Sequence, residues 1–136
     1  MKIKKIDHIG IAVKNLDESL KRWENITGAK RGVIEEIRER GVKVALLEFE
    51  SGPSVELVTS MEKDSPVEKF LEKRGEGIHH FSFVVEEIEE CMAELKKKGV
   101  QFIQEKPQRG AEGSFIAFLH PDNLNGVLIE LKEKKS

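Results

Sequence analysis

IDHIGIAV, residues Ile6–Val13, is matched 72 residues later by IHHFSFVV, residues Ile78–Val85. Both stretches are rich in β-branched or aromatic residues, which is typical of strands, and each has a histidine at its third position. Similarity at a fixed offset indicates an internal repeat. We therefore predict two related halves, each beginning with the strand that carries its histidine, His8 or His80.

Each of these strands is followed by an amphipathic helix. The pattern predicts one helix from about Leu16 to Ile26, ending at Gly28, and another from about Ile88 to Lys98, ending at Gly99. The apolar residues recur every three or four positions, which is the spacing of a helix that buries one face. Asn15, with a glutamate three residues later, is placed to cap the first helix.

Three strand-like stretches follow each helix, so each half has the order β-α-β-β-β. A short linking helix over about residues 65–74 joins the halves, because Ser65 suits the N-cap and Pro66 the first helical position. We predict one α+β domain of two such modules, about residues 1–62 and 76–136. The predicted strands are roughly residues 30–37, 42–50 and 54–59 in the first module and 100–106, 114–120 and 126–132 in the second.

The composition limits the class of function. The formal net charge is −2, from 23 basic and 25 acidic residues, and no basic stripe is present, which argues against a nucleic-acid partner. No apolar run approaches the roughly 20 residues that a membrane helix needs. Asp7 and His8 interrupt the basic N-terminus before a signal-peptide core could form. With Cys91 as the single cysteine, we predict a cytoplasmic protein without an internal disulfide or a membrane partner.

Four ionisable residues occupy equivalent places in the two halves. His8 and His80 lie on the first predicted strand of each half, and Glu56 and Glu130 lie on the last. Because side chains alternate between the faces of a strand, each of the four points away from its bulky apolar neighbours, which should pack on the helices. We expect these side chains to line the less crowded face.

Two imidazoles and two carboxylates form a donor set suited to a divalent transition metal. The two negative charges match the charge of the ion, and four protein ligands leave about one or two positions open for water or substrate. Each of the four residues taken singly is more often an ordinary polar residue. It is their pairing by the repeat that favours a shared metal site.

These features resemble the vicinal oxygen chelate superfamily, whose members are built from paired βαβββ modules, and within it the methylmalonyl-CoA epimerase family. The resemblance extends over nearly the whole chain, and GIHH and GVLIEL are its more specific parts. It implies that the two modules form a curved mixed β-sheet bowl with flanking helices. The segments that carry it are IDHIGIAV at Ile6–Val13, VEL at Val55–Leu57, SPV at Ser65–Val67, GEGIHH at Gly75–His80, FLHP at Phe118–Pro121 and GVLIEL at Gly126–Leu131.

The resemblance implies a metal-dependent isomerase that interconverts the two C2 epimers of methylmalonyl-CoA. The metal would stabilise the enolate formed when the α-proton leaves, and its ligands would be His8, Glu56, His80 and Glu130. Cobalt is the metal that the resemblance favours, with zinc, nickel, manganese and iron as alternatives. The implied partners are an acyl-CoA substrate and a second copy of the chain in a homodimer.

Three glutamates are candidates for the proton transfers, which epimerisation requires on both faces of the carbon. Glu130 or Glu56 can serve on one side if its bond to the metal is labile. Some epimerases carry a further glutamate just after a Gly-Val pair on the third strand, and Val44 stands at that position here. Glu48 shares the predicted strand face of Val44 and is the candidate to replace the missing carboxylate.

Two other functions remain open on the same scaffold. A glyoxalase I-like lactoylglutathione lyase also moves a proton beside a metal-polarised oxygen, and a glutamate at the position of Glu56 occurs in that branch as well. A non-catalytic small-molecule-binding protein would often have lost metal ligands, and all four are present here. An iron-dependent ring-cleaving dioxygenase fits less well, because Glu56 would take a position needed for oxygen or substrate.

Overall fold

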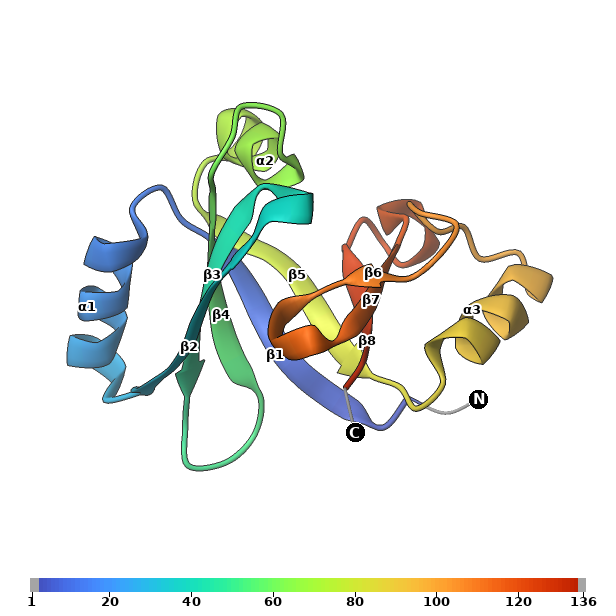
Figure 1. Cartoon of the computed structure of the whole chain (residues 1–136), viewed down its shortest axis with the longest axis horizontal. Helices are drawn as coiled ribbons and strands as arrows, with labels where there is room; N and C mark the ends of the chain where they lie inside the picture. Colours follow the sequence, from blue (N-terminus) through green and yellow to red (C-terminus); the bar gives the residue numbers. More distant parts are fainter. Residues whose placement is uncertain (1–2, 135–136) are drawn as a thin grey trace. The chain divides into compact units, whose positions relative to one another are not determined.

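The computed structural model describes residues 3–134, which divide into two compact units. The first unit is His8–His79, and the second unit combines residues 80–134 with residues 3–7. Each unit contributes four paired strands, and the helices and strands are labelled in Figure 1. No helix within residues 3–134 is long and apolar enough to cross a membrane.

The strands of the first unit are ordered β2-β3-β4-β1. β1 runs parallel to β4, whereas β3 runs antiparallel to both of its neighbours. The predicted order β-α-β-β-β followed by a linking helix is confirmed here. The elements are β1 Lys5–Ala12, α1 Leu16–Thr27, β2 Lys30–Ile37, the 3-10 helix Arg38–Arg40, β3 Val42–Glu48, β4 Ser54–Ser60 and α2 Pro66–Arg74.

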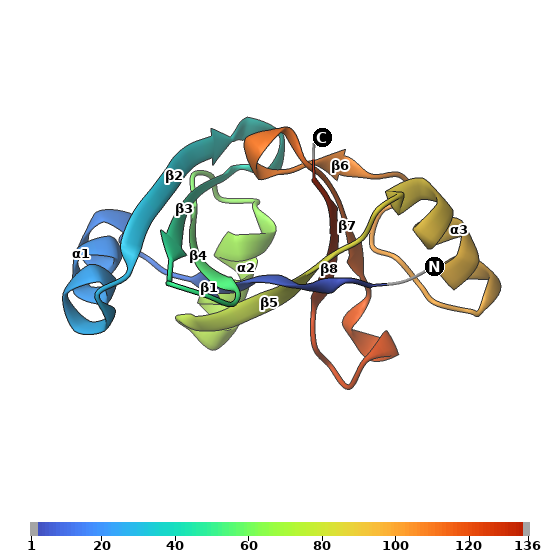
Figure 2. The ribbon, with the colours of Figure 1, turned by 90° about the horizontal axis from the view of Figure 1, so that it is seen from below.

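Helix α1 lies along one face of this sheet (Figure 2). The Asn15 side chain accepts a hydrogen bond from the backbone N–H of Glu18, as the predicted cap requires. The helix ends at Gly28, whose φ of 73° is a left-handed conformation that glycine adopts without a steric penalty. Its apolar face packs on the odd-numbered residues of the strands, in a buried cluster of Val13, Leu16, Leu20, Ala29, Ala45, Leu47 and Leu57.

The strands of the second unit are ordered β5-β8-β7-β6, with β5 parallel to β8 and the other pairs antiparallel. Its elements are β5 Gly77–Val84, α3 Ile88–Lys97, β6 Gln108–Arg109, the 3-10 helix Ala111–Gly113, β7 Phe115–Leu119, the 3-10 helix Pro121–Asn123 and β8 Ile129–Glu133.

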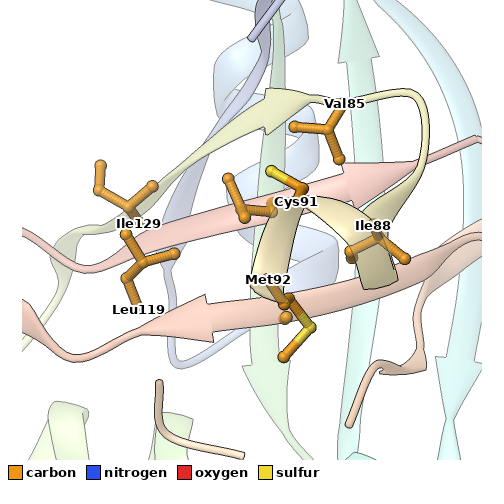
Figure 3. Close-up of a cluster of buried hydrophobic side chains, with 8 residues drawn as sticks. Val85, Ile88, Cys91, Met92, Leu119 and Ile129 are labelled. Carbon is orange, nitrogen blue, oxygen red and sulfur yellow. The ribbon is translucent and has the colours of Figure 1, made fainter. Parts of the chain in front are cut away.

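Helix α3 covers one face of β7 and β8 in the same way that α1 covers its sheet. Ile88, Cys91 and Met92 of the helix belong to one buried cluster with Leu119 and Ile129 of these strands, and Figure 3 shows their side chains. Burial raises the pKa of the Cys91 thiol, so this cysteine is a packing residue rather than a thiolate. The helix therefore leaves the opposite face of each strand for other side chains.

The strand predicted over residues 100–106 is wrong. That segment makes only an isolated bridge, between Phe102 and Leu119. The edge strand that pairs with β7 is the two-residue β6, further along the chain. Around this bridge the backbone N–H of Ile103 donates to the carbonyl of Phe118, and the N–H of His120 donates to the carbonyl of Gln101. Side chains satisfy two further groups: the Asn123 carboxamide accepts from the N–H of Gln101, and the Gln104 carboxamide accepts from the N–H of Phe118. Backbone and side-chain bonds together satisfy these groups without an extended β-ladder.

Candidate metal site and its two half-sites

His8 and Glu56 form a buried pair in the first unit. They lie on the parallel neighbours β1 and β4, where Gly10 is directly opposite Glu56 in the register. The His8 Nε2 and Glu56 Oε2 atoms are 3.6 Å apart. The two residues are only 1% and 7% exposed, respectively. Because Gly10 has no side chain, it leaves room on this face of the sheet between the histidine and the carboxylate.

His80 and Glu130 form the corresponding buried pair in the second unit. They lie on the parallel neighbours β5 and β8, where Ser82 is directly opposite Glu130. The His80 Nε2 and Glu130 Oε1 atoms are 4.0 Å apart, and the two residues are 3% and 4% exposed. The edge of the Phe118 ring meets the His80 ring, with centroids 5.8 Å apart.

The two pairs have the same construction. In each unit the glutamate stands opposite the residue two positions after the histidine, and that residue is small: Gly10 in one and Ser82 in the other. The repeat noticed in the sequence therefore places one imidazole and one carboxylate on the face that the helix does not cover. The residues predicted as ligands are brought together pairwise, one pair within each unit.

The chemistry of each pair fits a divalent metal ion. A buried carboxylate is costly unless a positive charge or hydrogen bonds compensate it. The separations of 3.6 and 4.0 Å exceed the roughly 3.2 Å limit of a direct hydrogen bond. His8, His80 and Glu130 each offer a buried ligand atom of a type that holds a metal ion.

Glu48, the third acidic candidate, lies at the exposed end of β3, opposite Lys30 of β2. Its carboxyl group lies over Gly32, where an added Cβ would stand 3.4 Å from the Glu48 Cδ and Oε2 atoms. Val44 is 2% exposed. It lies four residues before Glu48 on β3 and therefore on the same face of the strand.

His79 lies next to His80 but points to the other face of β5. Its ring meets Phe70 of α2 edge-on, with centroids 4.9 Å apart. Burial, with a smaller contribution from the positive charge of Arg40, lowers the pKa of His79 to about 4. His79 is therefore a neutral packing residue at physiological pH.

Stability should consequently decrease in mild acid. In the unfolded chain, histidine binds a proton below its ordinary pKa of about 6.5, whereas folded His79 resists protonation until about pH 4. This contribution is complete above about pH 6.5 and is lost as the pH falls towards 4, by at most about 3 kcal/mol at 1.36 kcal/mol per pH unit. When the pH is lowered from about 7 to about 5, the unfolding free energy of His79→Gln should therefore decrease by about 2 kcal/mol less than that of the wild type. Urea unfolding at the two pH values measures this difference.

His120, whose side chain is 45% exposed, provides the comparison for this experiment. The pH dependence of the unfolding free energy should change more in His79→Gln than in His120→Gln. Equal pH dependence of His79→Gln and the wild type would show that His79 is not the group responsible.

Comparisons with known proteins extend the similarity over nearly the whole chain. A family model described as the Glyoxalase/Bleomycin resistance protein/Dioxygenase superfamily matches residues 7–118. The uncharacterized protein YqjC of Bacillus subtilis is 40% identical over 96% of this chain and 93% of its own length. The mitochondrial methylmalonyl-CoA epimerase of Dictyostelium discoideum is 37% identical over 97% of this chain and 80% of its own.

A solved structure gives the same result for the fold. The crystal structure of methylmalonyl-CoA epimerase from Mycobacterium tuberculosis matches with a TM-score of 0.95 and 32% identity, over 98% of this chain and 90% of that one. The predicted α+β fold with two tandem βαβββ modules is thereby confirmed.

Proposed function

The chain belongs to the Glyoxalase/Bleomycin resistance protein/Dioxygenase superfamily, and we propose that within it the protein is an isomerase that interconverts the two C2 epimers of methylmalonyl-CoA. The observation that carries this proposal is the buried histidine–glutamate pair repeated in both units. The epimerase relatives, at 37% and 32% identity over almost the entire chain, support the choice of an acyl-CoA substrate.

The proposal assigns His8, Glu56, His80 and Glu130 to one divalent metal ion. Each unit supplies one neutral donor and one anionic donor, so the two carboxylates together balance the charge of the ion. Cobalt is the metal we propose, with zinc, nickel, manganese and iron as alternatives. When bound, the metal would supply Lewis acidity to the oxygens on either side of the reacting carbon.

The proton transfers at C2 are the task of acid/base side chains of the protein. The C2 hydrogen lies between a carboxylate and a thioester, so its removal and return on the opposite face interconverts the epimers. This requires an acid/base group on each side of the carbon. Glu130 or Glu56 is proposed for one side. Glu48 is the sequence-derived candidate for the other.

The decisive experiment is solvent deuterium exchange at C2 of methylmalonyl-CoA. The purified protein is treated with a chelator, and exchange and epimerisation are followed with and without added cobalt. We expect both reactions with the metal, and a loss of at least about 10³-fold without it, because Lewis-acid stabilisation is worth several kcal/mol. Urea unfolding with and without cobalt gives an independent reading of metal binding.

The two alternative functions are separate outcomes of this experiment. Activity on methylglyoxal and glutathione, without exchange at C2 of the thioester, would favour a glyoxalase I-like lyase. A protein that binds no metal and catalyses neither reaction would favour a binding function. We further propose a cytoplasmic homodimer, and a monomeric mass in sedimentation equilibrium would contradict the dimer.

A further inference from the structure

The hydroxyl group of Ser82 is buried in the second half-site, the pair of His80 and Glu130, without a hydrogen-bond partner. Ser82 is 0% exposed, and its Oγ atom makes no hydrogen bond to any group within residues 3–134. A buried hydroxyl without a partner costs free energy, and an alanine at the same position would not incur this cost. Buried polar side chains in proteins are hydrogen-bonded with few exceptions, so this hydroxyl requires an explanation.

The strand register places this hydroxyl beside the Glu130 carboxylate. Ser82 is directly opposite Glu130 in the parallel pairing of β5 and β8. Neighbouring strands lie about 4.8 Å apart, and residues paired in this way point to the same face of a sheet. Ser82 also follows His80 by two residues on β5, so it shares the face of the histidine. All three residues belong to the second unit.

Ser82 is the cross-strand neighbour of Glu130 that can donate a hydrogen bond to it. The other cross-strand neighbour is Phe118 of β7, whose side chain has no hydrogen-bonding group. Lys132 follows Glu130 by two residues on β8 and therefore shares its face. The ammonium group of Lys132 lies 3.1 Å from a carboxylate oxygen of Asp7. The hydroxyl of Ser82 is thus the donor whose partner remains to be assigned.

The first half-site, the pair of His8 and Glu56, has different surroundings. The cross-strand neighbours of Glu56 are Gly10 of β1 and Leu46 of β3, and neither has a hydrogen-bonding side chain. Gly10 leaves space at the position where the second half-site has a hydroxyl. The two carboxylates of the proposed metal site therefore differ in the donors that the neighbouring strands offer them.

A carboxylate can accept a hydrogen bond from Ser82 and bind a metal ion at the same time. It has two oxygens with about four lone-pair positions in total, so one oxygen can bind the ion while the other accepts. Carboxylates that bind metals in proteins are commonly hydrogen-bonded, which fixes their orientation. The serine Oγ atom reaches three staggered positions by rotation about χ1. The hydrogen bond therefore requires no movement of the two strands.

We propose that Ser82 is a positioning residue for Glu130, an inference that rests on the proposed function and its metal site. The Oγ–H group of Ser82 donates to the carboxylate oxygen that does not bind the ion, and this holds the other oxygen in the orientation for binding. The hydroxyl acts on the metal through Glu130 and does not itself bind the ion. A hydrogen bond to a carboxylate is charge-assisted and about twice as strong as one between neutral groups.

The test compares Ser82→Ala with the wild type in calorimetric titration with cobalt. Groups that orient metal ligands contribute about 10- to 100-fold to metal affinity, so we expect the dissociation constant to rise at least about tenfold. In urea unfolding without metal, the midpoint of the variant should be no lower than that of the wild type, because the hydroxyl has no partner within the described chain. A packing role would give the opposite result, a lower midpoint.

Ser19→Ala is the matched control. Ser19 is also a buried serine, 5% exposed, but it lies on α1 in the first unit. Its replacement should leave the affinity for cobalt at the wild-type value. A loss of affinity in both serine variants would show that the effect is not specific to Ser82, which would contradict the proposal.

Two further backgrounds show whether Ser82 acts through Glu130. In Glu56→Gln, which lacks the carboxylate of the first half-site, Ser82→Ala should still weaken cobalt binding about tenfold. In Glu130→Gln, the acceptor is a neutral amide oxygen, so the effect of Ser82→Ala should fall to about threefold or less. A double-mutant cycle of this kind isolates the interaction between two side chains. If Glu130→Gln binds cobalt too weakly to measure, the affinity and the metal-free stability of Ser82→Ala decide the question.

Three results would overturn the proposal: wild-type cobalt affinity in Ser82→Ala, an equal loss of affinity in the two backgrounds, or a lower urea midpoint of Ser82→Ala without metal. A wild-type protein that binds no cobalt would refute the metal site itself, and this inference with it, before any variant is compared. A wild-type protein that binds cobalt but neither exchanges nor epimerises methylmalonyl-CoA would refute the proposed function, and the measured affinities would still decide the role of Ser82.

Discussion

Glu130→Gln is expected to lower kcat/KM for epimerisation about 10³-fold, the effect of losing several kcal/mol of transition-state stabilisation. The substitution keeps the size and the burial of a side chain that is 4% exposed. It removes one of the two negative charges proposed to balance the metal ion. Steady-state kinetics with added cobalt measure the loss.

The same variant has a thermodynamic signature that does not depend on activity. The unfolding free energies of Glu130→Gln and the wild type without metal provide the two baselines. With cobalt in excess, the wild type should gain unfolding free energy according to RT ln(1 + [L]/Kd), whereas the variant should gain much less. Calorimetric titration with cobalt gives the affinities directly.

Glu72→Gln, an exposed change on α2, is the matched control and should behave as the wild type in both measurements. A Glu130→Gln variant that binds cobalt with unchanged affinity would remove Glu130 from the set of ligands. A variant that binds cobalt normally but has lost turnover would leave Glu130 a role in proton transfer alone.

The parts of this fold that could be predicted from the sequence depend on local pattern. Asn15 marks the start of α1, and its apolar spacing identifies the buried face of the helix. The alternation around His8 and Glu56 is sufficient to put both residues on the face away from the helix, once two neighbouring strands are assumed. Because of the internal repeat, the same reasoning puts His80 and Glu130 on the corresponding face of their own strands.

The parts that could not be predicted depend on contacts between distant segments. The assignment of residues 100–106 as a strand failed because its pairing ends after one bridge, and the side-chain amides of Asn123 and Gln104 accept from the backbone N–H groups of Gln101 and Phe118. No pattern in a single sequence reports such bonds.

Asp7 stabilises the fold through a contact with a residue far away in the sequence. Asp7→Asn is expected to lower the unfolding free energy by about 3–5 kcal/mol. Its Oδ2 atom lies 3.1 Å from the Nζ of Lys132, 125 residues further along the chain. Lys132 is 6% exposed. Without Asp7, the ammonium group of Lys132 would remain buried without its carboxylate partner.

Lys134 provides the comparison, because it pairs with the other oxygen of the same carboxylate. Its Nζ lies 3.0 Å from Asp7 Oδ1, but its side chain is exposed. Lys134→Gln should therefore cost only about 0–1 kcal/mol, and most of that should vanish at high salt. Urea unfolding of both variants at low and high salt measures the two contributions.

A loss below about 1 kcal/mol in Asp7→Asn would mean that water or a rearranged side chain compensates Lys132. A large loss that persists at high salt would place the dominant interaction at the buried lysine, since salt screens exposed charges far more than buried ones.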